Sequence, residues 1–256
     1  MAQRPERSLS VGVQVVVSLS IALVFTTVLW GLYPPVTVNT WILNPAVVTG
    51  LCLAGQLWYI SRSLVSPRVT RSPQVRLFGL ANTLTLIRGT LYAVVAGFVV
   101  VPPDTRFAWV PALAYGGGVV LDKLDGTVAR TVGQTTALGE RLDMTFDTFG
   151  FVVAPLVAVL WGQLPVWYLS LSAARYVYRG GLAWRRYRGR PLFDEPDSDL
   201  GRYLAGIQMV FLTVALTPAV PTAFVWSVAP IVLAPSLLVF ARDFLTVSGR
   251  LSGQGD

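Results

Sequence analysis

Long runs of uncharged, mostly apolar residues recur along this 256-residue sequence, the first of them from residue 11 to residue 33. A run of about 20 such residues is enough to cross the hydrocarbon core of a bilayer as a helix. Charged residues make up only 13% of the chain and hydrophobic residues 54%, whereas a soluble domain has roughly 25% charged residues. The sequence therefore predicts an all-α polytopic membrane protein.

Prolines, glycines and basic clusters divide the chain into eight expected spans. Two added helices are expected at about 11–33 and 44–60, before a basic connector with four arginines at 61–76. The six core helices are expected at about 80–101, 109–124, 139–161, from Pro165 into an arginine-rich segment, 201–216 and 223–240. We thus expect an N-terminal two-helix extension over 1–77, a six-helix catalytic core over 78–246 and a cytoplasmic tail over 247–256.

The cations indicate how these spans are oriented. With both termini in the cytoplasm, all of the 20 Lys and Arg except Arg106 lie in cytoplasmic segments or the helix ends beside them, as the positive-inside rule requires. The net charge of +7 is then explained by topology and not by nucleic acid. We expect a multi-pass protein of the prokaryotic cell membrane. The lone Cys52 excludes an internal disulfide framework.

Four carboxylates interrupt this apolar sequence as two pairs. Asp122 and Asp125 are three residues apart, Asp143 and Asp147 four apart, so each pair shares one helix face. A short joining segment makes the two helices antiparallel neighbours, which sets the pairs opposite each other on the cytoplasmic side. Ionised Asp in a bilayer needs compensating charge, and oxygen ligands without any His favour a hard divalent cation, Mg²⁺, Mn²⁺ or Ca²⁺.

Two interpretations of the acids remain open from spacing alone. Two cations held by shared carboxylates are a known arrangement for displacement at phosphorus. Alternatively, the acids are solvated helix ends or pair with the nearby Arg130 and Arg141. The glycines and alanines interleaved with the acids favour the metal site, because ion pairing does not require small residues there.

The acids belong to a longer pattern that resembles the signature of the CDP-alcohol phosphotransferase family. Every specified residue and every gap is present in Asp122-x2-Asp125-Gly126-x2-Ala129-Arg130-x8-Gly139-x3-Asp143-x3-Asp147. Shorter matches are Asn82-x-Leu84-Thr85-x2-Arg88, which resembles the entry to the first core helix of the family, and Gly201-Arg202 followed by Gln208. The resemblance covers about residues 78 to 246.

This resemblance implies a metal-dependent transferase of phospholipid biosynthesis that releases CMP. It implies a CDP-linked lipid donor, such as CDP-diacylglycerol or an archaeal analogue, an alcohol acceptor, two Mg²⁺ or Mn²⁺ ions and a homodimer. Asp122, Asp125 and Asp143 would be metal ligands, and Asp147 would combine metal contact with general-base catalysis. Contacts to the donor nucleotide and pyrophosphate would come from Asp122, Gly126, Ala129, Arg130 and Gly139.

The acceptor alcohol stays open at this stage. Arg175, Arg179 and Arg202 are candidates for contacts to an acceptor or a phosphate, although a positive-inside anchor is the competing interpretation of the first two. Members that use a phosphorylated acceptor often have a basic residue after the fourth Asp, whereas here it is Thr148. Serine, glycerol phosphate and inositol phosphate all remain candidates.

Two other classes of function would also place acids in a membrane protein. A divalent-cation transporter needs polar groups along a path through the midplane, whereas these acids are expected near one surface. A non-catalytic membrane scaffold has no use for four acids at this spacing. The sequence therefore favours the transferase.

Overall fold

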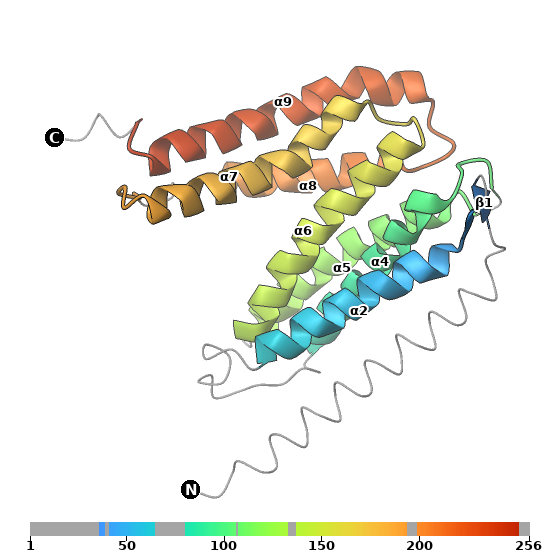
Figure 1. Ribbon diagram of the computed structural model, residues 1–256, viewed down its shortest axis with the longest axis horizontal. Helices are drawn as coiled ribbons and strands as arrows, with labels where there is room; N and C mark the ends of the chain where they lie inside the picture. Colours follow the sequence, from blue (N-terminus) through green and yellow to red (C-terminus); the bar gives the residue numbers. More distant parts are fainter. Residues whose placement is uncertain are drawn as a thin grey trace, which may run out of the picture. The chain divides into compact units, whose positions relative to one another are not determined.

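The computed structural model describes residues 36–38, 41–64, 80–105, 107–132, 137–193 and 199–250 (Figure 1). The chain divides into two compact units, Met1–Val157 and Ala158–Asp256, which are described separately below. The expected first span at 11–33 and the expected boundary near residue 77 lie outside the described residues. Both stay predictions.

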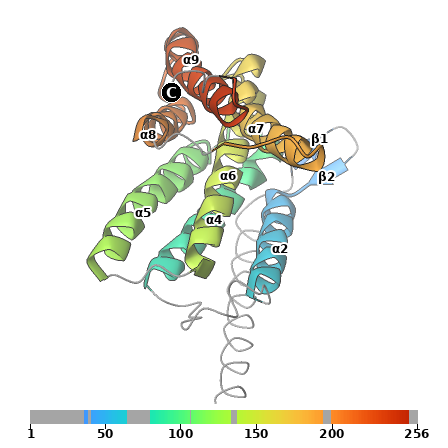
Figure 2. The ribbon, with the colours of Figure 1, turned by 90° about the vertical axis from the view of Figure 1, so that its left-hand side faces the viewer.

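The described residues of the first unit form a short hairpin and four helices. The strands are β1 (Val36–Val38) and β2 (Trp41–Leu43), which pair antiparallel with Val36 opposite Leu43. The helices are α2 (Pro45–Leu64), α4 (Leu80–Gly97, followed by the 3-10 turn η1, Phe98–Val100), α5 (Val110–Val132) and α6 (Ala137–Leu160), whose last three residues belong to the second unit. Figure 2 shows α5 and α2 on opposite sides of α4 and α6.

The hairpin was not predicted, because its strands are far shorter than the membrane-spanning runs on which the predicted elements were based. Its two strands consist of three residues each and are rich in β-branched and aromatic side chains, which favour extended structure. Outside this hairpin, the regular structure of the described residues is helical. The all-α expectation therefore holds for the part of the fold that carries the acids.

α4 packs against α2 in an antiparallel direction. The side-chain amide of Gln56 on α2 donates a hydrogen bond to the carbonyl of Gly89 at 2.9 Å. At the other end of α4, a Cβ added to Gly97 would lie 2.9 Å from the carbonyl oxygen of Pro45. As α2 advances from Pro45 to Gln56, α4 thus runs back from Gly97 to Gly89.

Tyr92 fixes the directions of the other two helices around α4. Its buried ring packs against both Gly118 of α5 and Gly150 of α6, where an added Cβ would overlap the ring. One turn earlier on α4, Arg88 contacts Asp122 of α5 and Asp147 of α6. α5 therefore runs antiparallel to α4, α6 runs parallel to it, and the two acid-bearing helices are antiparallel as predicted.

An apolar cluster beside these contacts joins α2 to α6. Ile60 of α2 packs with Leu138, Leu142 and Phe146 of α6, all nearly inaccessible to solvent. The ring of Phe146 also lies against Gly89, where an added Cβ would be 2.8 Å from the ring. Apolar burial therefore holds the acidic end of α6 against α2 and α4.

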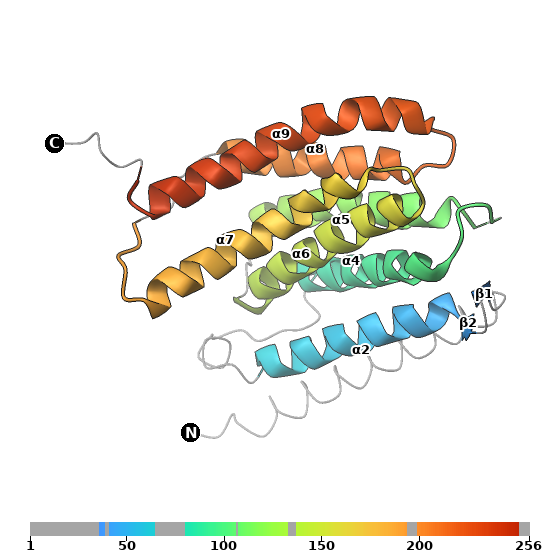
Figure 3. The ribbon, with the colours of Figure 1, turned by 45° about the horizontal axis from the view of Figure 1, so that its top comes forward.

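The second unit consists of the 3-10 turn η2 (Val166–Leu169) and the helices α7 (Ser170–Tyr187), α8 (Asp199–Ala215) and α9 (Thr222–Val247). Figure 3 shows the three helices of this unit. Along α7 and α9, Tyr178 packs against Phe240, Gly181 against Phe244, and Arg185 donates to the carbonyl of Ser248 at 2.9 Å. In these contacts the residue numbers of α7 and α9 increase in the same direction, so the two helices are parallel.

A buried polar group links the elements of this second unit. Gln208 of α8 accepts a hydrogen bond from the Tyr168 hydroxyl and donates to the Val232 carbonyl and the Ser236 hydroxyl, each at 2.9 Å. A buried amide is favourable only when it is hydrogen-bonded. Gln208, noted in the sequence only as part of a short family match, therefore has a structural role between η2 and α9.

Most helices lie where the sequence predicted them, but three run further, and α2 ends at Leu64 and not near residue 60. α5 continues from the expected end near residue 124 to Val132, and α9 continues from residue 240 to Val247. The expectation followed the end of the apolar run, whereas a helix can continue into water through good helix formers such as Ala and Arg. Asp125, Gly126, Ala129 and Arg130 consequently all lie on α5.

Two of the described helices are long and apolar enough to cross a membrane, Leu138–Leu160 and Thr222–Val247. The shorter helical segment Leu84–Val100 is also apolar. These helices agree with an all-α membrane protein. The number of spans, eight in our expectation, stays a prediction.

The contacts of Tyr92 predict which glycines the first unit requires. We expect Gly118→Ala and Gly150→Ala to lower the thermal stability of the detergent-purified protein, because overpacking costs about 1–3 kcal/mol. The control is Gly55→Ala on α2, where an added Cβ meets no atom within 4 Å and the change should be neutral or slightly stabilising. Combining Gly150→Ala with Tyr92→Leu should restore part of the loss. Equal melting temperatures for all three single variants would contradict this packing.

Candidate metal centre

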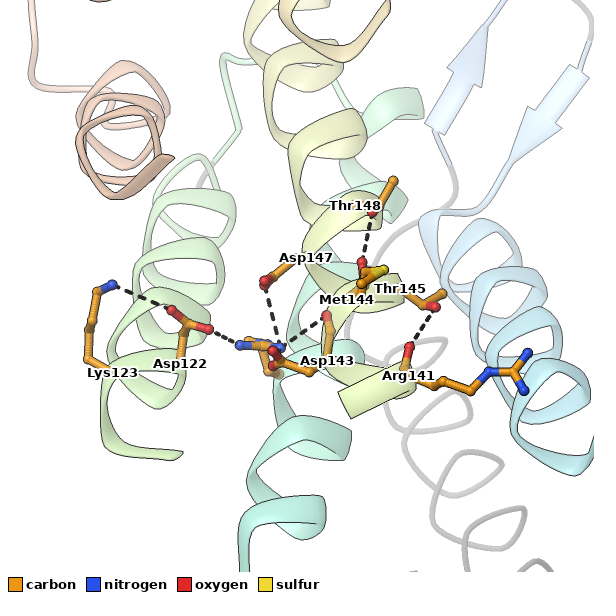
Figure 4. Close-up of polar contacts among 9 residues, drawn as sticks. Asp122, Lys123, Arg141, Asp143, Met144, Thr145, Asp147 and Thr148 are labelled. Carbon is orange, nitrogen blue, oxygen red and sulfur yellow. Dashed lines mark hydrogen bonds and ion pairs between the residues drawn. The ribbon is translucent and has the colours of Figure 1, made fainter. Parts of the chain in front are cut away.

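Three carboxylates from two helices converge in the first unit. Asp122 comes from α5, and Asp143 and Asp147 come from successive turns of α6; one oxygen from each lies within 4.8 Å of the others (Figure 4). The side chains are partly accessible, at 18% for Asp122, 41% for Asp143 and 23% for Asp147. The predicted meeting of the two acidic helices is therefore present, and water or a ligand can reach it.

The cation at the centre of this group is Arg88 of α4, which is fully buried. Its Nη1 donates to Oδ1 of Asp122, and its Nη2 donates to Oδ1 of Asp143. The same Nη2 lies 3.4 Å from Oδ1 of Asp147. One guanidinium thus contacts all three carboxylates and connects α4 to both α5 and α6.

Because Arg88 is buried, its ion pairs contribute to the stability of the fold. A charge removed from water is strongly unfavourable unless it is paired and hydrogen-bonded, and breaking a buried pair typically costs about 3–5 kcal/mol. By contrast, Lys123 lies 3.7 Å from the other oxygen of Asp122 with its side chain 66% exposed, and exposed pairs contribute little. Arg88 is therefore the cation that holds the carboxylates together.

Tyr92 closes the site on its inner side. It follows Arg88 by one turn of α4 and packs against Gly118 and Gly150, which lie one turn from Asp122 and Asp147 respectively. The Tyr92 hydroxyl is buried and has no hydrogen-bond partner among the described residues. Gly118 and Gly150 thus make room for a protein side chain at this depth.

The structure decides one alternative that the sequence left open. Figure 4 shows the side chain of Arg141 directed toward α2 and away from the acids. The hydroxyls of Thr145 and Thr148 donate to carbonyls of their own helix, those of Arg141 and Met144, at 2.8 and 2.7 Å. Among the described side chains, the arginine beside the acids is Arg88, from a distant part of the sequence, and not the nearby Arg141. The alternative pairing with Arg130 stays open, because its side chain is outside the described residues.

Other predicted site residues occupy known elements without a described contact to the acids. Asp125, Gly126, Ala129 and Arg130 lie on α5, but their side chains are outside the described residues. Gly139 lies in the first turn of α6. Their expected roles stay predictions.

The three acceptor candidates belong to the second unit. Arg175 and Arg179 lie on α7. Arg202 lies on α8, where it pairs with Asp199 at 2.8 Å while both side chains remain largely exposed. Such an exposed pair contributes little to stability, and the proposed binding roles of all three arginines stay predictions.

The donor set fits a divalent cation. Carboxylate oxygens suit hard ions such as Mg²⁺ and Mn²⁺, and Asp122, Asp143 and Asp147 could hold one. All three contacts from Arg88 go to the Oδ1 atoms. Each carboxylate has a second oxygen with which it could bind a metal.

Sequence reasoning missed the role of Arg88, which it noted only as the last residue of a short family match. A signal was present, since Arg88 is the one charged residue between Arg76 and Asp104. An ionisable residue inside an apolar helix is by default a candidate functional residue that needs a partner. Applied here, that rule would have marked Arg88 as a residue that needs an acidic partner, without showing which acids these are.

The fold and the site together define a helical membrane protein with an oxygen-only acidic centre. The family model for CDP-alcohol phosphatidyltransferase matches residues 78–240, a segment that contains Arg88 and all four acids. The chain therefore belongs to the CDP-alcohol phosphatidyltransferase family. This confirms the resemblance, and together with the two long apolar helices it indicates a protein integrated in a membrane.

Curated relatives share a shorter stretch with this chain. Proteins named "Putative cardiolipin synthase" from Mycobacterium tuberculosis and Mycobacterium bovis are 31% identical over 116 residues, which is 44% of this chain and 54% of each relative. The chain thus spans about half the length of the curated relatives it matches. No solved structure matches the chain.

The acidic centre predicts how metal binding depends on individual carboxylates. Asp122→Asn or Asp143→Asn should weaken Mn²⁺ binding to the purified protein about 10–100-fold or more, since even residues behind the ligands have effects of that size. The measurement is titration of free Mn²⁺ by electron paramagnetic resonance. Asp243→Asn, which removes a carboxylate paired with Arg242 on α9, is the control and should bind as the wild type does. Unchanged affinity in both site variants would exclude this centre.

Proposed function

We propose that this chain is an integral membrane transferase that moves a phosphatidyl-type group from a CDP-linked lipid donor to an alcohol and releases CMP. The observation that carries the proposal is the convergence of Asp122, Asp143 and Asp147 around Arg88, because the spacing of these acids resembles the family motif. A set of acids gathered without such a motif would fit many metal-binding proteins. Motif and geometry together favour phosphoryl chemistry.

Each acid has a distinct proposed task. Asp122, Asp125 and Asp143 would hold Mg²⁺ or Mn²⁺, two ions in all, and Asp147 would be a further ligand. Bound ions of this kind neutralise the pyrophosphate of the donor and stabilise the departing CMP. Gly126, Ala129 and Gly139 leave space for the nucleotide, and Arg130 offers a planar fork to phosphate oxygens.

Asp147 is the proposed general base. It lies one helical turn past Asp143 toward the middle of α6, close to the contact between Tyr92 and Gly150. The acceptor oxygen forms a bond to the phosphorus that carries the lipid, and the bond from that phosphorus to the bridging oxygen of the pyrophosphate breaks. CMP leaves with that electron pair, and the hydroxyl proton passes to the Asp147 carboxylate.

The wider arrangement of the protein is also part of the proposal. We infer eight membrane spans, a six-helix core over residues 78–246 preceded by a two-helix extension, and an active site on the cytoplasmic side of a prokaryotic cell membrane. The family assignment and the distribution of cations support this arrangement. A homodimer is the proposed assembly.

The acceptor is an alcohol that Arg175, Arg179 and Arg202 would help to bind if it carries a phosphate. The name of the mycobacterial relatives adds one candidate to serine, glycerol phosphate and inositol phosphate. Cardiolipin holds two phosphatidyl groups on one glycerol, so its formation by this reaction requires a glycerol that already carries one. Phosphatidylglycerol is therefore included among the acceptors to be tested.

The proposed function predicts metal-dependent CMP release. Protein reconstituted in lipid nanodiscs with CDP-diacylglycerol should release CMP when Mg²⁺ and one of the four acceptors are present. Excess chelator should abolish the release, because the pyrophosphate charge is then not neutralised. A cation transporter or a scaffold would release no CMP with any acceptor, and that result would overturn the proposal. Turnover in excess chelator would contradict the metal-dependent mechanism.

The role of Asp147 predicts a separation of binding from turnover. Asp147→Asn should lower turnover by about 10²–10⁴, the usual range for the loss of a general base, while CDP-diacylglycerol still binds. Asp122→Asn should lose both binding and turnover. Single-turnover kinetics and equilibrium donor binding distinguish the two effects. If binding and turnover fall in parallel for Asp147→Asn, this residue is a metal ligand and not the base.

A further inference from the structure

We propose that Arg88 is a permanent internal cation of the site, which weakens metal binding in the absence of the donor and strengthens binding of the anionic donor to the metal-loaded protein. The inference rests on the proposed function, because it assigns the second ligand as a pyrophosphate. Arg88 would thereby affect the two binding events in opposite directions. It acts through charge and position and does not take part in the proton transfer.

The geometry indicates that Arg88 stays in place when ligands bind. Its side chain is fully buried, and its two terminal nitrogens contact carboxylates on both α5 and α6. An arginine cannot lose its proton in a protein, so a displaced Arg88 would need new partners. Tyr92 on the next turn packs tightly against both neighbouring helices, and no described acid other than these three contacts the guanidinium.

The contacts leave the outer part of the site available. Arg88 uses Oδ1 of Asp122, Asp143 and Asp147. The other oxygen of Asp122 faces Lys123, whose side chain is largely exposed. The side chains of the three acids are all partly accessible, while Arg88 itself is not. The guanidinium thus supports the carboxylates from the protein side, and a ligand would approach them from the opposite side.

A charge count shows what this arrangement does. With the largely exposed Lys123 left out of the count, Asp122, Asp143 and Asp147 contribute −3 and Arg88 +1, which gives −2 for these four residues. With Asp125, as proposed, the site carries −3, and two divalent cations bring it to +1. Without Arg88 the loaded site would be neutral. The single positive charge that remains is therefore attributable to Arg88, and it complements a pyrophosphate.

Opposite effects on two ligands follow from this charge. A fixed cation beside the acids repels Mg²⁺ or Mn²⁺ and lowers their affinity when they bind alone. The same cation attracts the pyrophosphate across a short, poorly screened distance. Because the charge is fixed, it acts on each ligand separately, so removing it should change the two affinities in opposite directions.

The test compares the wild type with Arg88→Gln and Arg88→Lys. For each protein, the affinity for Mn²⁺ is measured first, and then the affinity of the Mn²⁺-loaded protein for cytidine diphosphate. Arg88→Gln should bind Mn²⁺ as tightly as the wild type or more tightly, yet bind cytidine diphosphate at least about ten-fold more weakly. Arg88→Lys keeps the charge and should stay within about three-fold of the wild type for both ligands. Arg242→Gln, which removes an arginine that pairs with the adjacent Asp243 on α9, is the control.

Three outcomes would overturn the inference. A parallel loss of Mn²⁺ and nucleotide binding in Arg88→Gln would make Arg88 a purely structural brace. Unchanged nucleotide binding would show that its charge does not reach the donor. If Arg88→Gln does not fold, Arg88→Lys decides, because a large loss despite the retained charge contradicts a role for charge. Wild-type protein that neither binds Mn²⁺ nor releases CMP would instead refute the proposed function.

Discussion

A permanently charged guanidinium buried among apolar helices requires carboxylates around it, and this requirement organises the first unit. Arg88 on α4 cannot become neutral and has no access to water, so α5 and α6 must bring acids to it. The acids, for their part, would repel one another at these separations without a cation. Each charged group therefore stabilises the placement of the others, and the candidate metal centre forms where they meet.

Close helix packing makes this meeting possible. Gly118 and Gly150 allow α5 and α6 to approach the ring of Tyr92, and Gly89 allows α4 to approach Phe146. Small residues at helix contacts are typical of membrane proteins, in which association depends on packing between helices. Here they also set the register, because Tyr92 occupies the layer directly next to Arg88. The same contacts that hold the helices together thus align the acids.

Much of the site could be predicted from local spacing. The gaps between Asp122, Asp125, Asp143 and Asp147 predicted two acidic helix faces, and the short segment between the helices predicted that they run antiparallel. The family match over residues 78–240 covers all four acids, and their roles stay predictions. Helical periodicity and a short connection are local properties, which explains why a single sequence was sufficient.

The partner of the acids could not be found in this way. Arg88 is 34 residues from Asp122 and 55 from Asp143 in the sequence, so their contact depends on tertiary packing that no local pattern encodes. The hairpin formed by β1 and β2 was missed because its strands are much shorter than a membrane-spanning helix. The ends of α5 and α9 were missed because the end of an apolar run marks a membrane boundary and does not mark the end of a helix. Tertiary contacts and helix continuation into water are the properties that the sequence analysis did not capture.

The central claim is that one buried arginine and at least three carboxylates form a single centre that binds metal without losing its internal cation. Anomalous diffraction from crystals grown with Mn²⁺ and cytidine diphosphate tests it most directly. We expect Mn²⁺ peaks about 2.1 Å from oxygens of Asp122, Asp143 and Asp147, with Arg88 still paired to the same carboxylates. Mn²⁺ bound elsewhere, or an Arg88 side chain displaced from the acids in the loaded protein, would contradict the account.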